Sequence, residues 1–372
     1  MIYIDNAATT FPKPKRVLDE MNFCLKKYCG NPGRSSHQLS LKAAEAVYST
    51  REKVAAMFGR ETAECVVFTY NATYALNLAI KSFLTPNCHV LTSDFEHNSV
   101  IRPLEKLKQS RGIEYSSFSS DGNIDKNIRS SIRQNTAGII CSLASNVTAD
   151  YVELSLLSKI AKEMNLFLII DASQAAGHKE IDLCKTTCDV FCAPGHKALF
   201  GIQGCGFAIF KDNQRRESFI EGGSGSDSES LFMPQLLPEA YEAGTLSTPA
   251  IVSLGSGIDY INEIGIINIE EKLNVLTENA YSALSSIKGL RIYDSGSGIL
   301  SFNYKDIPSS IVASMLDTEG ICVRGGLHCA PSIHRKIGTL HQGAVRVSFS
   351  YLNHFSDIDC LYKAMRKIAM LN

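Results

Sequence analysis

The chain has 372 residues, of which 45% are hydrophobic and 20% are charged, a composition that supplies a core and excludes disordered and fibrous proteins. Lysine and arginine number 37 against 38 aspartates and glutamates, a net charge of −1, which lacks the basic excess of proteins that bind nucleic acid or anionic lipid. At roughly 150 residues per domain, we expect a globular protein of about two domains, with no nucleic acid and no membrane among its partners.

The N-terminus and the cysteines indicate the compartment. No basic segment followed by an apolar run opens the chain, and apolar runs such as 166–170 are far shorter than the about 18 residues of a membrane-spanning helix. The 12 cysteines form no CxxC pair, and most, such as Cys141 and Cys192, lie inside apolar runs. We therefore expect a cytoplasmic protein whose cysteines are reduced.

Short apolar runs alternate with segments of helical period between residues 66 and 210. The runs are rich in valine, isoleucine and phenylalanine and predict buried strands at 66–69, 90–92, 113–118, 138–143, 166–170, 189–193 and 206–210. Helices are predicted between them at 72–83, 98–110, 124–133 and 153–164. This alternation predicts an α/β fold with a mainly parallel sheet, without fixing the strand order.

The pattern changes after about residue 248. Long helical stretches at 249–264 and 269–287 are followed by short strands near 299–303 and 345–350, which predicts a smaller α+β domain at the C-terminus. A glycine- and serine-rich stretch at 222–228 is expected to be a flexible loop. We divide the chain into an N-terminal segment, 1–14, that packs with the small domain, a large domain, 15–255, and the small domain, 256–372.

Two charged residues follow predicted strands. Asp171 comes directly after the run 166–170, at the sheet edge where open α/β folds bind ligands, and could hold a cationic ring nitrogen. Alternatively it caps the next turn. Lys197 follows the run 189–193 in a loop rich in glycine, where a desolvated lysine could form a Schiff base, although an ordinary surface lysine is the alternative.

Two further turns complete a pattern. The turn Tyr70–Thr73 offers backbone N–H groups and a hydroxyl to a phosphate, or else is a plain helix N-cap. His97 could stack on a flat cofactor ring, or be a solvated loop histidine. The order of phosphate turn, histidine, Asp171 and Lys197, each at a strand end, is typical of enzymes that bind pyridoxal phosphate (PLP).

Longer motifs carry a family resemblance. Asp171-Ala-Ser-Gln174, Pro194-Gly-His-Lys197, Glu242-Ala-Gly-Thr245 and Arg324–Pro331, with the opening Tyr3–Thr10, resemble the class V aminotransferase family, and most closely its cysteine desulfurase / selenocysteine lyase branch. The resemblance runs from residue 3 to about residue 350. It implies the PLP-dependent transferase fold type I, a large PLP-binding domain and a homodimer.

The resemblance also implies roles for individual residues. Lys197 would carry the cofactor, Asp171 would pair with its pyridine nitrogen and Gln174 with its phenolic oxygen, while His97 would stack on the ring. The remaining cofactor contacts would come from Ala72, Thr73, Asn146, His196 and, lent by the other subunit, Thr245.

The substrate residues are implied in the same way. Arg346 would hold the substrate carboxylate with Asn146 beside it, although a salt bridge that fastens a strand is the alternative for Arg346. Lys197, His97 and Cys329 would be the catalytic residues. L-cysteine would become L-alanine, and its sulfur would be held as a persulfide on Cys329 for an acceptor protein. Cys329 suits this role because a cationic neighbour or an exposed polar loop favours the thiolate, and His328 is adjacent in the sequence.

Several alternatives remain open. The same residues fit a lyase acting on L-selenocysteine, another class V PLP enzyme in which Cys329 is incidental, or a non-catalytic scaffold for sulfur transfer. The spacing of Cys329, His334 and His341 matches no standard zinc pattern, so no metal is expected.

Overall fold

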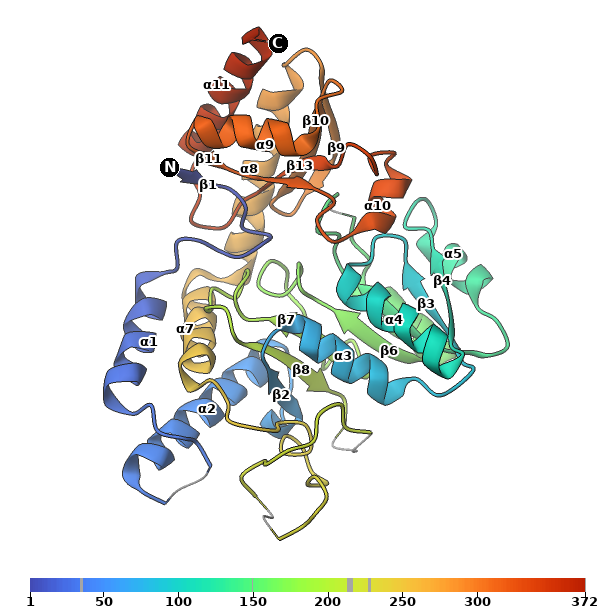
Figure 1. Ribbon diagram of the computed structural model, residues 1–372, viewed down its shortest axis with the longest axis vertical. Helices are drawn as coiled ribbons and strands as arrows, with labels where there is room; N and C mark the ends of the chain where they lie inside the picture. Colours follow the sequence, from blue (N-terminus) through green and yellow to red (C-terminus); the bar gives the residue numbers. More distant parts are fainter. Residues whose placement is uncertain (34–35, 149, 213–216, 227–228, 372) are drawn as a thin grey trace.

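A seven-stranded sheet forms the centre of the larger part of the molecule (Figure 1). The computed structural model describes residues 1–33, 36–148, 150–212, 217–226 and 229–371. In sheet order the strands are β2 (Val66–Thr69), β8 (Gly206–Phe210), β7 (Val190–Pro194), β6 (Phe167–Asp171), β5 (Thr136–Ser142), β3 (His89–Ser93) and β4 (Glu114–Phe118). Every strand predicted between residues 66 and 210 is therefore confirmed, with ends within two residues of those expected.

Five neighbouring strands, β7-β6-β5-β3-β4, run parallel, whereas β8 is antiparallel to both β7 and β2. The direction of β8 follows from the connection before it. Residues 195–205 contain no helix, and a parallel return needs a crossover of about a dozen residues or more, usually helical. The predicted α/β fold with a mainly parallel sheet is confirmed.

Helices cover both faces of this sheet because alternate residues of each strand point to opposite sides. One core cluster joins Val67, Ile140 and Ile169 to α3 (Ala72–Phe83) and α4 (Asn98–Arg111). The strand residues that point to the other face belong to a second cluster. The helices that pack into this cluster are α1 (Lys15–Lys27), α2 (Gln38–Met57), α5 (Ile124–Ser131), α6 (Leu154–Glu163) and α7 (Thr248–Ile264). A short 3-10 helix, Ala63–Cys65, precedes β2.

The C-terminal part is built on a four-stranded antiparallel sheet in the order β12-β13-β10-β9. Its strands are β9 (Leu290–Gly296), β10 (Ile299–Tyr304), β12 (Arg324–Gly326) and β13 (Ala344–Ser348), and its helices are α8 (Ile266–Ser285), α9 (Ser309–Thr318), α10 (Pro331–Lys336) and α11 (Phe355–Leu371). The expected strands near 299–303 and 345–350 correspond to β10 and β13.

The N-terminal segment belongs to both parts of the molecule. Strand β1 (Ile2–Tyr3) pairs in parallel with β11 (Ile321–Cys322), and Asp5 forms a bridge with Ser348 of β13. A few residues later, Thr10 and Lys13 hydrogen-bond to the loop after β7. The segment thus connects the C-terminal sheet to the edge of the central sheet.

The chain bends by 81° between α7 and α8. Helix α7 packs against α1 and α2, whereas α8 packs against β9 and α11. The expected division at 255/256 falls inside α7, and we propose that the domain boundary lies at Gly265, between the two helices. No single helix in the described ranges has the length and apolar composition to cross a membrane; only the bent α7–α8 pair meets that test jointly.

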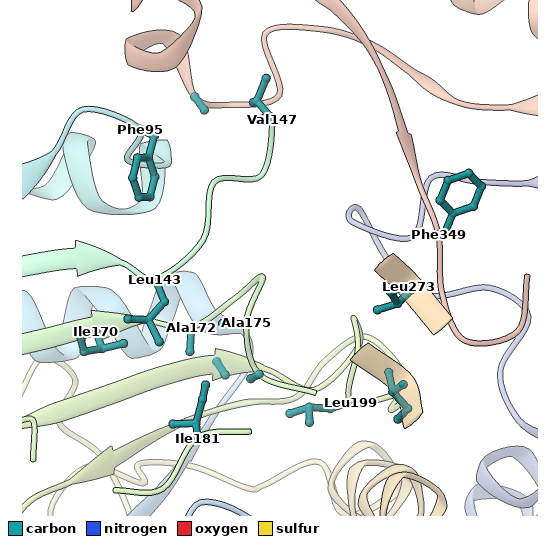
Figure 2. Close-up of a cluster of buried hydrophobic side chains, with 14 of the residues drawn as sticks. Phe95, Leu143, Val147, Ile170, Ala172, Ala175, Ile181, Leu199, Leu273 and Phe349 are labelled. Carbon is teal, nitrogen blue, oxygen red and sulfur yellow. The ribbon is translucent and has the colours of Figure 1, made fainter. Parts of the chain in front are cut away.

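One core cluster runs through both parts of the molecule. Figure 2 shows side chains of this cluster, from Ile170 of β6 past Val147 to Leu273 of α8 and Phe349 beyond β13. The two parts are therefore packed together over buried apolar surface. The expected loop at 222–228 has neither helix nor strand at 222–226, and residues 227 and 228 lie outside the described residues.

A buried ion pair fastens the motif Glu242–Thr245 to the sheet. Arg51 of α2 donates to both carboxylate oxygens of Glu242, at 2.7 and 2.9 Å, and the backbone N–H of Phe68 in β2 donates to the same carboxylate at 2.6 Å. The two side chains are only 5% and 7% exposed. An unpaired charge left in this position would be poorly solvated.

We predict that Arg51→Met lowers the free energy of unfolding by about 3 kcal/mol or more, because it leaves the Glu242 carboxylate buried without its cation. Urea unfolding followed by circular dichroism would measure the loss. Asp19→Asn, in the exposed Lys15–Asp19 pair, is the matched control and should leave the midpoint unchanged. Equal stabilities for the two variants would contradict the prediction.

Candidate active site

A cavity of about 220 Å³ opens at the carboxyl edge of the parallel strands. Its size is near the lower end for ligand pockets, which suits a small molecule rather than a polymer. Nine of the residues predicted from the sequence line it: Ala72, Thr73, His97, Asn146, Asp171, Gln174, His196, Lys197 and Arg346. The structure therefore brings together residues that lie as far apart in the chain as 72 and 346.

Asp171 and Lys197 occupy the ends of two adjacent parallel strands. Asp171 ends β6, is 4% exposed, and accepts a 2.9 Å hydrogen bond from the Ser173 N–H. Lys197 follows the end of β7. Burial lowers the pKa of Lys197 to about 8, although the Asp171 carboxylate acts to raise it. A larger fraction of this amine is therefore neutral, and able to attack a carbonyl carbon, than in an exposed lysine.

The N-terminal segment holds the loop that carries Lys197. The Thr10 hydroxyl donates to the Lys197 carbonyl at 2.6 Å, and the Lys13 amine donates to the His196 carbonyl at 2.7 Å. Gln174 Nε2 donates to the Ala7 carbonyl at 3.2 Å. These bonds fix the backbone at Ala7, His196 and Lys197 and so limit where the Lys197 amine can lie.

The N-terminus of α3 faces the cavity through Asn71, Ala72 and Thr73. Asn71 caps the helix by accepting from the Tyr74 N–H at 3.1 Å. Close behind it lies Gly206 of β8, where an added Cβ would approach Asn71 C to 2.5 Å. Glycine at this position lets the helix start sit against the sheet, with its N–H groups and positive dipole end towards the cavity, an arrangement that binds anions.

His97 is the N-cap residue of α4. Its Nδ1 accepts a 3.0 Å hydrogen bond from the Ser99 N–H, which requires an unprotonated Nδ1. In agreement, burial lowers the pKa of His97 to about 4. The ring is therefore neutral and held at one orientation, in the wall of the cavity beside Asp171 and Lys197.

Arg346 of β13 is 1% exposed and makes the ion pair that was the alternative to a substrate role. Its Nη2 lies 2.7 Å from Asp5 Oδ1, and its Nη1 donates to the Asn146 carbonyl at 3.0 Å. Its Nε is buried and has no hydrogen-bond partner within the protein. Arg346 thus makes the ion pair and also lines the cavity.

Cys329 is exposed and lies beside the residues that line the cavity rather than among them. Its carbonyl accepts from the Asn98 N–H at 2.7 Å, and the preceding His328 carbonyl accepts from Asn146 Nδ2 at 2.7 Å. Arg324 Nη2 lies 4.0 Å from the thiol sulfur. The thiol is thus held at the rim of the cavity.

The cation near the thiol is Arg324, and not His328 as the adjacency in sequence suggested. The Nε2 of His328 lies 3.0 Å from the Ala344 carbonyl, and no contact between this ring and the Cys329 sulfur is found within the described residues. Burial and the nearby Arg346 hold its pKa well below the ordinary value, so this ring is neutral. Cys329 therefore has the expected cationic neighbour, but this neighbour is Arg324.

Two residues of the candidate site were not predicted from the sequence. Arg324 lines the cavity, and Asp5 holds Arg346; both stood inside motifs that were quoted, but only the fold shows what they face. Thr245 lies outside this cavity and lines a second, apolar one with Tyr70 and Tyr241. Its phosphate contact from a second subunit stays a prediction. Among the described residues, no group of three or more histidine, cysteine, aspartate or glutamate side chains could hold a metal ion.

Comparisons with known proteins agree with one another. The sequence profile of the aminotransferase class-V family matches residues 2–361. A protein from Methanothermobacter thermautotrophicus named "probable cysteine desulfurase" is 32% identical over 99% of this chain and 94% of its own length, and another with that name from Halalkalibacterium halodurans is 29% identical over 99% and 93%.

Solved structures show the same fold. The apo cysteine desulfurase of Thermococcus onnurineus NA1 is 27% identical, covers 100% of this chain and 95% of its own, and superposes with a TM-score of 0.90. The Escherichia coli cysteine desulfurase CsdA, at 24% identity over 99% of this chain and 94% of its own, also gives a TM-score of 0.90.

We predict that PLP attaches to the apoprotein faster as the pH rises, with a midpoint near pH 8, because only the neutral Lys197 amine attacks an aldehyde. Asp171→Asn should move this midpoint to lower pH, because the Asp171 carboxylate stabilises the ammonium form of Lys197 and the variant lacks it. Stopped-flow absorbance of the bound cofactor would measure both. A midpoint near the ordinary lysine value of 10.5, or no shift in Asp171→Asn, would count against this account of the amine.

Proposed function

Because the chain belongs to the aminotransferase class-V family, as its motifs predicted, we propose that it is a PLP-dependent cysteine desulfurase. It converts L-cysteine to L-alanine and keeps the sulfur as a persulfide on Cys329 for transfer to an acceptor protein. The observation that carries this proposal is the position of the Cys329 thiol at the rim of the cavity that holds Lys197 and Asp171.

The residues of the cavity fit PLP. The Lys197 amine would attach the cofactor, and the Asp171 carboxylate would favour a protonated ring nitrogen. The N–H groups at the start of α3, the Thr73 hydroxyl and His196 would hold its phosphate, and His97 would stack on its ring. When bound, PLP withdraws electrons from the bonds at the substrate α-carbon.

The substrate carboxylate is held by Arg346, with the Asn146 side chain beside it. The position of Arg346 in the lining of the cavity, opposite Arg324 on the neighbouring strand, supports this role. Arg324 adds a second positive charge on the same side of the cavity. This placement directs the sulfur of the substrate towards the rim.

The Cys329 thiolate attacks that sulfur. A sulfur–sulfur bond forms, the bond between the substrate Cβ and its sulfur breaks, and the electron pair remains on the carbon fragment, which takes up a proton and leaves as L-alanine. The Arg324 guanidinium, with its Nη2 4.0 Å from the Cys329 sulfur, places a positive charge beside the attacking group. The persulfide then stands at an exposed position, where an acceptor protein can reach it.

The enzyme works as a homodimer in this proposal. The segment before Thr245 carries strongly exposed apolar side chains: Leu231 is 97%, Phe232 79% and Leu236 63% exposed. Such a group of side chains supports an interface with a second copy. The setting is the reducing cytoplasm, where the twelve cysteines, all unpaired in the structure, stay as thiols.

We predict that Cys329→Ala abolishes persulfide formation while PLP and L-cysteine still bind, because the variant keeps the cavity and loses only the nucleophile. Alanine release and protein-bound sulfur would be measured together by mass spectrometry. Cys360→Ala, at another exposed cysteine, is the matched control and should behave as the parent protein. Undiminished alanine release by Cys329→Ala would overturn the desulfurase assignment, and L-selenocysteine tested in parallel would separate the lyase alternative.

We predict that Thr245→Val weakens PLP binding although Thr245 lies outside the cavity of its own subunit. Subunits carrying Thr245→Val and subunits carrying Lys197→Ala should each be impaired alone. A mixed dimer should regain activity, since one of its two sites then has an intact Lys197 from one chain and an intact Thr245 from the other. Absence of any recovery after mixing would show that Thr245 does not act across a dimer.

A further inference from the structure

Lys336 lies among several carboxylates close to the segment that carries Cys329. It is the last residue of α10, which begins two residues after Cys329 and lies beside the loops near α5 and β4 (Figure 1). Around its Nζ are four oxygen atoms: Ser120 Oγ at 2.6 Å, Asp121 Oδ1 at 2.8 Å, Asp94 Oδ2 at 3.2 Å and Asp150 Oδ1 at 3.9 Å.

The three acids belong to three different loops of the large domain. Asp94 follows β3, Asp121 follows β4, and Asp150 lies in the turn after β5. Lys336, Asp94 and Asp150 are partly buried, with side-chain exposures of 20%, 22% and 18%. Burial opposes the charge of Lys336, but Asp121, Asp150 and Asp94 outweigh it, so its pKa is raised and it stays cationic.

Two of these loops, those after β3 and β5, also carry residues that line the candidate active site. Asp94 lies three residues before His97, on the same turn. The Thr148 hydroxyl donates to Asp150 within the turn that carries Asn146, which in turn binds the His328 carbonyl. Through Lys336, the segment after Cys329 is therefore attached to the same backbone that shapes the cavity.

The backbone at Cys329 needs such support. His328 and Cys329 both adopt left-handed conformations, with φ of 51° and 57°, which side chains other than glycine adopt at a cost. Two hydrogen bonds hold their carbonyls, from Asn146 and Asn98. The contacts of Lys336 are a third attachment of this segment. Without the Lys336 ammonium group, the carboxylates of Asp94, Asp121 and Asp150 would repel one another there.

We infer that Lys336 is a positioning residue: it fastens the Cys329 segment to three loops of the large domain and so holds the thiol at the rim of the cavity. The expected effect of Lys336 on catalysis rests on the proposed function, whereas the attachment of the Cys329 segment to the three loops does not. Lys336 is not among the residues that line the cavity, and it acts through the position of Cys329.

The test uses the full-length protein reconstituted with PLP. Lys336→Met should slow persulfide formation from L-cysteine by about fivefold or more, because a small misplacement of a reacting group has a large effect on rate. The absorbance change on mixing with L-cysteine, which reports substrate binding, should be unchanged. Lys336→Arg, which keeps the positive charge, should recover most of the rate, and Lys363→Met, at an exposed lysine of α11, is the matched control.

Hydrogen–deuterium exchange of residues 324–336 gives a readout independent of activity. Exchange should be faster in Lys336→Met than in the parent protein and Lys363→Met. If Lys336→Met does not fold, Asp121→Asn, at a 71% exposed partner, should show the same changes in weaker form. Unchanged exchange and rate in the folded variant, or in Asp121→Asn in its place, would overturn the inference. A parent protein that forms no persulfide would refute the proposed function and leave the exchange result to decide the attachment.

Discussion

The site depends on a lysine amine that is desolvated at the carboxyl edge of a parallel sheet, next to a buried carboxylate. Burial alone would favour the neutral amine, and Asp171 opposes it, so the two effects set the pKa of Lys197 at about 8. This balance requires a fixed loop. The bonds from Thr10 and Lys13 to the backbone at 196 and 197 provide it, as does the parallel register of β6 and β7.

The C-terminal part of the molecule contributes Arg324, His328 and Arg346 to the cavity, and it is joined to the rest by polar contacts as well as by a shared core. Arg346 contacts both Asp5 and the carbonyl of Asn146, so one side chain connects the N-terminal segment, a large-domain turn and a small-domain strand. Buried charges of this kind are costly to leave unpaired and therefore specify one arrangement of the parts. The cavity is a product of that arrangement.

The sequence predicted the central sheet well because its strands are short, apolar and separated by periodic helices. Helix 72–83 was predicted with its observed ends, since Asn71 is a good N-cap and the apolar period is clear. Helices α1, α2, α9, α10 and α11 and strands β1, β9, β11 and β12 were not predicted. Nor could the sequence give the direction of β8 or the neighbours of a side chain: His328 is adjacent to Cys329 in the chain, yet Arg324 is the cation beside its thiol.

The pairing of β1 with β11 has a consequence for biosynthesis. Ile2 and Tyr3 leave the ribosome long before their partners Ile321 and Cys322, and Asp5 long before Arg346. Domains that complete early in translation can fold before the chain is released, whereas these contacts span more than 300 residues and form late. The nascent protein can therefore assemble its central sheet during synthesis, but it completes the lining of the cavity only once the chain has emerged beyond Arg346.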